Sequence, residues 1–223
     1  IPSSLTVKEY GYNFGIDPRK GQKTGFFTDQ RDKRRALQKY AAGLPAGATL
    51  LNCFSYTAGF SVYATIAQPA LRTINVDQSA GALEMARHNF ELNSLDPSGH
   101  IFEVADAFKW LEAERERGGQ HDIVILDPPA FAKSHREKEK ALQGYTRLNR
   151  LGLPLVKPGG FLVTCSCSGS VLLEEFATCV REAAAPSGRS IQVLETFENG
   201  LDHPVSLAAP EGRYLKVLFC RVI

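Results

Sequence analysis

The chain has 223 residues, of which 43% are hydrophobic and 22% charged, and its formal net charge is +2. This length supports one sizeable folded core, and the composition is ordinary for a globular protein. So small a net charge does not by itself indicate a nucleic-acid partner, and no apolar run is long enough to cross a membrane, so we expect no membrane partner.

The predicted elements begin with a small β-hairpin in the first thirty residues, followed by a glycine-rich loop and a helix over 29–44. From residue 48 onward, apolar strands alternate with helical patterns. The predicted strands are 48–54, 72–77, 100–106, 121–127 and 161–166, and the predicted helices are 59–68, 79–93, 107–118, 145–156 and 172–186. Two strand-like runs, 191–198 and 213–223, close the chain without a helix between them, which predicts an antiparallel pair.

This order of elements predicts the fold class. Strands that alternate with helices form βαβ units with right-handed crossovers and a mostly parallel sheet. We therefore predict an α/β fold of the doubly wound, Rossmann-like kind. It has a mostly parallel seven-stranded sheet with an antiparallel edge strand, and a small N-terminal β-hairpin. The predicted division is residues 1–30 for the hairpin and loop segment and 31–223 for the α/β domain.

Candidate site residues follow the strands, because ligands of such sheets bind outside the carboxyl ends of the strands. The stretch NCFSYTAGF suits a tight turn against a ligand but is not GxGxxG, so a nicotinamide dehydrogenase is improbable. Asp77 could accept hydrogen bonds from a ribose diol, although an acidic cap on the next helix is an equal alternative. Asp106 could meet an adenine amino group.

The fourth strand ends in Asp127-Pro128-Pro129. Two consecutive prolines remove two backbone donors and fix φ, which gives a rigid corner. Such a pair can simply end a strand, but an acid held at this corner is suited to gripping a planar base. We favour the functional interpretation.

The five cysteines include Cys165 and Cys167 in TCSCSG. Without a signal-peptide layout, reduced thiols in the cytoplasm are expected. Zinc is disfavoured because the partner ligand pair is missing, and no CxxC redox pair is present. Both cysteines could be core residues, but Cys167 follows the strand and could act as a thiolate nucleophile. Cys165 is predicted to pack, and the remaining three are predicted to be structural: Cys53, Cys179 and Cys220.

Two segments concentrate basic charge. Residues 17–35 hold seven Lys or Arg against three Asp, and residues 133–150 hold six against two acids. Such runs are usually solvated faces, but they could contact phosphates if they frame one cleft.

Five stretches taken together resemble one family: KTGFFTDQRDKR, LNCFSYTAGF, NVDQSAGALEMARHN, VILDPPAF and TCSCSG. They are similar to the bacterial class I S-adenosylmethionine (SAM)-dependent methyltransferases that modify cytosine C5 in large-subunit ribosomal RNA. The resemblance runs from about residue 7 to the C-terminus, where PEGRYLKVLFCRVI also fits. It implies SAM as the cofactor, S-adenosylhomocysteine (SAH) as the product and large-subunit rRNA as the partner.

The resemblance also assigns residues to parts of the site. The lip of the cofactor pocket would comprise Lys23, Thr24, Gly25, Phe27, Asp29 and Arg31. The methionine part would lie against Phe54, Ser55, Tyr56, Thr57 and Gly59. Around the nucleoside and the target base would lie Asp77 at the ribose, Ser79 beside it, Asp106 at the adenine, and Asp127 and Pro128 bordering both ligands. On the substrate side would lie Pro129, with Phe131 and Tyr145 stacking on the base, and the family's motif cysteine falls on Cys167.

The implied chemistry explains why a cysteine is needed. Cytosine C5 is too weak a nucleophile to take a methyl group directly, and a thiolate that adds at C6 raises the electron density at C5. Asp127 would stabilise the charge that builds on N3. Two alternatives stay open: methylation of a base amino group, for which Cys167 is incidental, and a non-catalytic RNA-binding module of the same fold.

Members of this family usually carry an N-terminal PUA-type RNA-binding domain. Here the sequence begins IPSSLTV, without a methionine, so it could be a processed chain or part of a longer one. It therefore resembles the catalytic domain alone, and the partners left open are a homodimer and a missing RNA-binding domain.

Overall fold

The computed structural model describes residues 5–19, 25–132, 134–209 and 212–223. The chain divides into two compact units, residues 1–106 and 107–223, which we call unit 1 and unit 2. No helix within these described ranges is long and apolar enough to cross a membrane.

Unit 1 combines a hairpin with a three-stranded parallel group. The hairpin strands β1 and β2 are antiparallel, as the sequence predicts, and the strand order of the group is β5-β4-β3. The elements are β1 (Leu5–Glu9), β2 (Tyr12–Ile16), η1 (Thr28–Gln30), α1 (Arg31–Ala42), β3 (Thr49–Cys53), α2 (Gly59–Ala67), β4 (Arg72–Asp77), α3 (Ala80–Leu92), η2 (Pro97–Gly99) and β5 (Ile101–Val104).

The hairpin packs on the helices of unit 1. Phe14 of β2 is fully buried and stacks on Phe26, with ring centroids 4.9 Å apart. The Gly15 amide donates to Asn89 Oδ1 of α3 at 2.8 Å, and a Cβ on Gly15 would lie 2.7 Å from Met85 Sδ. Glycine therefore allows the close approach of β2 to α3, and residues on both sides of residue 30 share one core. The domain boundary at residue 30 stays a prediction.

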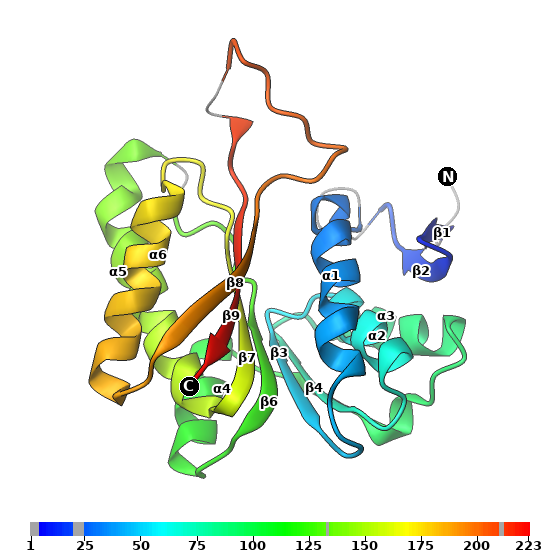
Figure 1. Cartoon of the computed structure of the whole chain (residues 1–223). Helices are drawn as coiled ribbons and strands as arrows, with labels where there is room; N and C mark the ends of the chain where they lie inside the picture. The colour runs from blue at the N-terminus through cyan, green and yellow to red at the C-terminus, as the bar shows by residue number, and fades with distance from the viewer. Residues whose placement is uncertain (1–4, 20–24, 133, 210–211) are drawn as a thin grey trace. The chain divides into compact units, whose positions relative to one another are not determined.

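Unit 2 contains four strands in the order β6-β7-β9-β8. Strands β6 and β7 are parallel, while β9 is antiparallel to both β7 and β8. The predicted closing pair is thus confirmed, and β9 lies between its partners so that β8 takes the outer position. The elements are α4 (Ala107–Glu116), β6 (His121–Leu126), η3 (His135–Glu137), α5 (Lys138–Gly152), η4 (Leu153–Leu155), β7 (Val156–Ser166), α6 (Leu173–Ala184), η5 (Ala185–Ser187), β8 (Ile191–Phe197) and β9 (Lys216–Val222), and Figure 1 shows α5 and α6 running side by side.

Two elements of unit 2 begin earlier than the sequence predicts. Helix α5 begins at Lys138 rather than at residue 145, because its charged first turns carry Ala141 and Tyr145 on a buried stripe. Strand β7 begins at Val156 and runs through the KPGG stretch, which reads as a break in sequence. The pairing of β6 with β7 shifts register between His121 and Ile123, which accommodates these residues without ending the strand.

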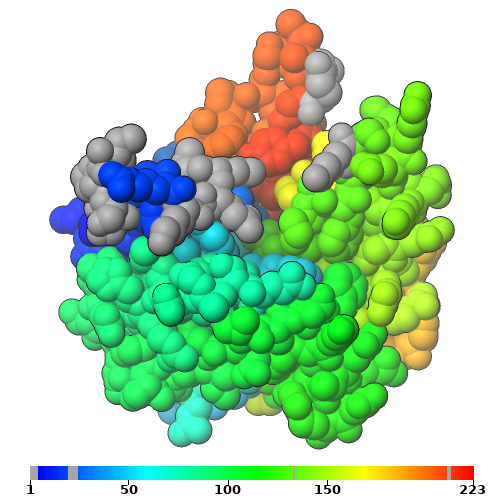
Figure 2. All heavy atoms as spheres, turned by 180° about the vertical axis from the view of Figure 1, so that it is seen from behind, coloured from blue at the N-terminus to red at the C-terminus, as the bar shows by residue number. Residues whose placement is uncertain are grey.

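A long connection joins β8 to β9. Figure 1 shows it extending well beyond the ends of these two strands, and its orange residues stand out in the space-filling view of Figure 2. Leu201 and Leu207 on this connection are 84% and 100% exposed. Strand β9 is mostly buried, whereas β8 is half-buried or exposed along its length, and the exposed leucines show that the connection adds surface rather than core.

Candidate functional site

The loop after β3 has a strained backbone. Phe54, Tyr56 and Ala58 have φ values of 58°, 47° and 57°. Left-handed conformations cost a non-glycine residue on the order of 1 kcal/mol each, and they concentrate at ligand-binding turns. The stretch FSYTA, selected in sequence for its small residues, is therefore held in a shape that the surrounding structure must enforce.

Asp77 at the end of β4 enforces this shape. Its Oδ2 accepts a hydrogen bond from the Tyr56 amide at 2.8 Å, and its Oδ1 accepts one from the Ser79 amide at 2.9 Å. Ser79 is the N-cap of α3, as predicted, with its Oγ accepting from the Ala82 amide at 3.2 Å. Each carboxylate oxygen of Asp77 has a further lone pair, so capping and ligand binding are compatible roles.

Ser55 carries a polar group that the protein leaves unsatisfied. Its side chain is 7% exposed, and its Oγ has no hydrogen-bond partner within the described ranges. A buried hydroxyl without a partner is costly, and a bound ligand can supply the missing hydrogen bond. Thr57, which lies two residues further along the chain and is also assigned to the methionine part of the cofactor, is buried as well. The loop thus fits the polar end of a small ligand.

Asp106 lies two residues beyond β5 and is half-buried. Its Oδ2 accepts from Gln78 Nε2 at 2.8 Å. Sequence reasoning missed Gln78, although its place directly after the strand-ending Asp77 was the available signal. The pair joins two of the strand ends at which the sequence predicts nucleoside contacts.

The predicted lip lies partly outside the described residues: Lys23 and Thr24 fall there, while Gly25, Phe27, Asp29 and Arg31 are described. Phe27 packs edge-on against Tyr56, with ring centroids 5.2 Å apart, so the lip contacts the loop after β3 that is assigned to the methionine part of the cofactor. Asp29 is buried in η1, and Arg31 lies 3.8 Å from Asp32.

Arg34 holds this lip, and sequence reasoning missed it. Its guanidinium makes two 2.7 Å hydrogen bonds to the Glu9 carboxylate and donates to the Phe27 carbonyl at 3.0 Å. A Cβ on Gly59 would lie 2.9 Å from Arg34 Cδ. Gly59 thus makes room for this arginine, whereas the sequence suggests that it makes room for a ligand.

Unit 2 brings the second group of predicted residues together. Leu126 of β6 pairs with Thr164 of the parallel strand β7, so both strands end at one edge. Beyond that edge Asp127 is half-buried, Pro128 is buried and Pro129 is exposed. The Cys167 Sγ donates to the Pro128 carbonyl at 3.6 Å, which joins the cysteine motif to the proline corner. Cys167 is partly exposed, while Cys165 is fully buried, as predicted for a packing residue.

Tyr145 requires a correction. The sequence suggests that it stacks on a base, but its side chain is fully buried and the Phe131 ring lies 4.6 Å from it. Burial raises the pKa of Tyr145, and its hydroxyl hydrogen-bonds to Ser168 Oγ at 2.9 Å. Tyr145 therefore supports Phe131 from beneath, and half-buried Phe131 is the aromatic side chain that reaches the surface.

Replacing Ser168 with alanine should lower the free energy of unfolding by about 2 kcal/mol. Ser168 Oγ accepts from the Ala132 amide at 3.1 Å and bonds to the Tyr145 hydroxyl, so the buried Ala132 amide would lose its acceptor and Tyr145 one of its hydrogen bonds. Urea unfolding measures the loss. Ser170→Ala is the matched control, because Ser170 Oγ has no hydrogen-bond partner among the residues that the structure describes. Equal losses in the two variants would contradict the prediction.

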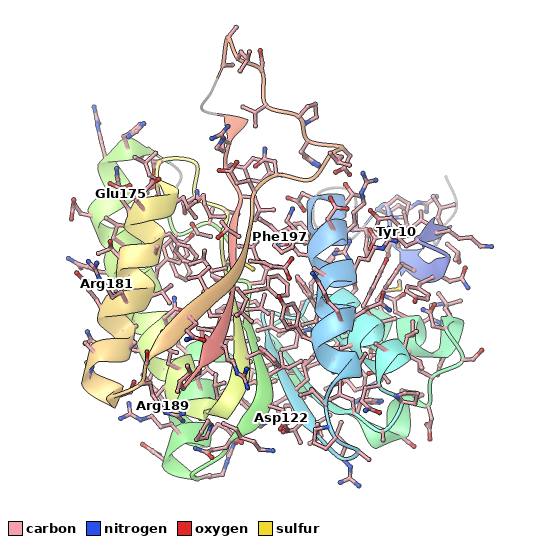
Figure 3. The ribbon with its side chains drawn as sticks, in the orientation of Figure 1. Tyr10, Asp122, Glu175, Arg181, Arg189 and Phe197 are labelled. Atoms are coloured by element: carbon pink, nitrogen blue, oxygen red, sulfur yellow. The ribbon has the colours of Figure 1, made fainter. Side chains whose placement is uncertain are left out.

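The basic segments are only partly solvated. Lys33 is 1% exposed and donates to the Asp29 carbonyl at 2.8 Å, and Arg34 is buried with Glu9. In the second segment, Lys138 pairs with Glu175 at 2.6 Å. Glu175 lies in the first turn of α6 and is labelled in Figure 3. Several of these charges therefore stabilise the fold and are unavailable to phosphates.

Known proteins are similar to this chain in sequence and in fold. Residues 3–220 match the family model described as S-adenosylmethionine-dependent methyltransferase. Over 217 residues the chain is 45% identical to the ribosomal RNA large subunit methyltransferase I of Aeromonas salmonicida, covering 97% of this chain and 54% of that protein. The chain thus spans about half the length of the curated relatives it matches.

Two solved structures have a fold similar to that of this chain. A SAM-dependent methyltransferase of Streptococcus mutans superposes with a TM-score of 0.84 at 28% identity, covering 99% of this chain and 56% of that chain. A methyltransferase complexed with SAH gives the same values. This likeness confirms the predicted α/β, Rossmann-like fold with its mostly parallel strands and antiparallel closing hairpin.

Proposed function

Because the chain belongs to the S-adenosylmethionine-dependent methyltransferase family, we propose that it methylates C5 of a cytosine in large-subunit ribosomal RNA, through a covalent adduct with Cys167. The observation that carries the proposal is the partly exposed Cys167 thiol on the Pro128 carbonyl of the Asp-Pro-Pro corner. The rRNA substrate is supported by the name of the Aeromonas salmonicida relative.

The residues of unit 1 suit SAM. Asp77 would accept the ribose hydroxyls while it holds the Tyr56 amide, and Ser55 Oγ would gain a polar partner in the bound cofactor. Asp106, oriented by Gln78, would meet the adenine amino group. When bound, SAM supplies an electrophilic methyl group on its sulfonium. The contact between Phe27 of the lip and Tyr56 of the loop after β3 would exclude water from this end of the site.

The residues of unit 2 suit the target base. The Cys167 thiolate forms a bond to C6 of cytosine, and the electron pair of the C5–C6 double bond moves toward C5 and N3. The carboxyl of Asp127, in its protonated form, stabilises N3 by donating a hydrogen bond as negative charge builds there. C5 becomes nucleophilic enough to accept the methyl group, and SAH would be the leaving group. Water then takes the proton from C5, and the electron pair of that C–H bond restores the C5–C6 double bond and expels the Cys167 thiolate, so the enzyme is regenerated.

The cytosine must leave its stack before Cys167 can reach it. Unstacking costs a few kcal/mol in a duplex and less in a loop or single strand. Phe131, supported by buried Tyr145, offers an aromatic face for the extruded base, beside exposed Pro129. Base–aromatic stacking recovers about 1–3 kcal/mol. The substrate is therefore expected to present the cytosine outside a regular helix.

The test is to incubate the protein with isotopically labelled SAM and unmodified large-subunit rRNA, and to identify the labelled nucleoside by mass spectrometry. We expect label in 5-methylcytidine. Label in a methylated adenosine or guanosine would instead indicate methylation of an amino group, without a role for the thiol. Calorimetric titration with SAM separates both outcomes from a non-catalytic module that binds RNA but not the cofactor.

A further inference from the structure

A buried lysine lies next to the cysteine motif. Lys216 is the first residue of β9, and it pairs across the antiparallel ladder with Ser166, the residue before Cys167. Its Nζ donates to the carbonyl of Ser168, the residue after Cys167, at 2.6 Å. A second donation goes to the Tyr214 carbonyl at 2.8 Å. Lys216 therefore contacts both neighbours of Cys167, Ser166 through the strand pairing and Ser168 through its ammonium group.

This lysine is costly to the fold. Its side chain is 2% exposed, and burial lowers the pKa of Lys216 to about 8, against the opposing influence of Cys167, Glu175 and Glu198. Buried lysines are rare unless paired, and a neutral side chain of similar length would fill the same space. At neutral pH the amine still carries its proton, so the protein keeps a positive charge in its interior at this turn.

The thiol by itself is poorly placed to ionise. The Cys167 Sγ donates to the Pro128 carbonyl, and a hydrogen bond made by the neutral form favours that form. A carbonyl oxygen also repels a thiolate. Since the thiolate is the nucleophilic species, a positive charge close to Cys167 is needed to offset this effect.

We infer that Lys216 is a positioning residue that stabilises the thiolate of Cys167 and fixes the turn on which the thiol stands. This inference rests on the proposed function, in which Cys167 is the nucleophile. On activation the S–H bond breaks, the proton goes to water, and the electron pair stays on sulfur. Lys216 keeps its three protons throughout.

The other charged groups near Lys216 have partners of their own. Glu175 pairs with Lys138 at 2.6 Å, and Glu198 lies 3.4 Å from Arg213. Tyr145 faces Cys167 from α5, and burial raises the pKa of its hydroxyl, so it is neutral over the working range of pH. The carboxylates are thus partly neutralised, which leaves the Lys216 charge to act on the sulfur.

The test is the pH dependence of Cys167 alkylation by iodoacetamide, resolved by site with mass spectrometry, in wild-type protein and Lys216→Met. The other four cysteines are buried and should react slowly. We expect Cys167 of the variant to be alkylated about tenfold more slowly at pH 7, which corresponds to a rise of about one pH unit in the midpoint of thiolate formation. The difference should shrink above pH 8, because wild-type Lys216 then loses its own proton. Lys216→Arg should restore the rate.

Lys157→Met is the matched control. Lys157 lies near the other end of β7 and pairs with Asp122 at 2.8 Å, so its loss should not change the alkylation profile. Methyl transfer by Lys216→Met should fall about tenfold at pH 7 and recover as the pH rises, which loss of folding would not produce.

Superimposable profiles for wild type and folded Lys216→Met would overturn the inference. If Lys216→Met does not fold, the wild-type profile decides, since a Cys167 midpoint at or above the usual thiol value of about 8.5 is incompatible with a stabilising cation. Alkylation needs neither RNA nor SAM. The two proposals can therefore fail separately. If Lys216→Met shifts the pH profile of alkylation as expected but Cys167→Ala still transfers methyl groups, the proposed covalent mechanism is wrong and the Lys216–Cys167 interaction is confirmed.

Discussion

Cys167→Ala should lower methyl transfer to rRNA by at least about 10³-fold, because loss of the attacking atom removes the covalent route altogether. SAM affinity should be unchanged, since the residues that we assign to the cofactor's ribose, adenine and methionine lie in unit 1. Single-turnover methylation and calorimetric titration with SAM measure the two quantities. Loss of turnover together with loss of SAM binding would indicate misfolding instead.

Cys165→Ala provides the matched control. Cys165 lies in the same motif but is fully buried in β7, so its truncation removes core packing and leaves Cys167 and Pro128 in place. We expect a modest loss of stability and turnover within a few-fold of wild type. If Cys167→Ala also keeps wild-type turnover, and the label lies on an amino group, TCSCSG is a packing motif and the covalent mechanism is wrong.

Asp77→Ala should raise the Kd for SAM about 100-fold. The substitution removes the acceptor of two hydrogen bonds, from the Tyr56 and Ser79 amides, each worth about 1.5–3 kcal/mol when the acceptor is charged. It also releases the strained loop and removes the group assigned to the ribose. A loss of about 2.7 kcal/mol corresponds to 100-fold in affinity. Calorimetric titration with SAM and SAH gives the values.

The control for this variant is Asp96→Ala. Asp96 Oδ1 accepts from the Ser98 amide at 2.9 Å, the same local bond that Asp77 makes to Ser79, but it caps η2. It should affect local stability and leave the SAM Kd within about twofold of wild type. Equal affinities for wild-type protein and folded Asp77→Ala would show that Asp77 only caps the helix that follows it.

The order of elements was predictable because hydrophobic periodicity is a local property. Apolar runs such as 121–127 and 161–166 identify strands buried on both faces, and the amphipathic pattern of 79–93 identifies a helix, with Ser79 as its cap. Boundaries were less predictable. The charged start of α5 and the Pro-Gly-Gly stretch in β7 read as breaks, because their stability comes from tertiary packing and a shift in strand register.

Part of the candidate site was likewise predictable from the sequence, and part was not. Asp77, Asp106, Asp127 and Cys167 could be selected from sequence, since ligands of α/β folds bind outside the carboxyl ends of strands and each residue lies at or just after such an end. The sequence by itself thus determined the fold class, while the choice of strand ends and of their chemistry stays a prediction from the sequence.

Only the tertiary structure decided which charged and aromatic side chains are available. Lys33 and Arg34 belong to a basic run that reads as a solvated face, yet both are buried against carbonyl or carboxylate oxygens, and Lys216, which no sequence pattern singled out, is buried in the same way. Tyr145 reads as a stacking residue and lies beneath Phe131. Burial and pairing depend on segments distant in sequence, such as Glu9 with Arg34 or Ser168 with Lys216, and local residue patterns carry no information about these contacts.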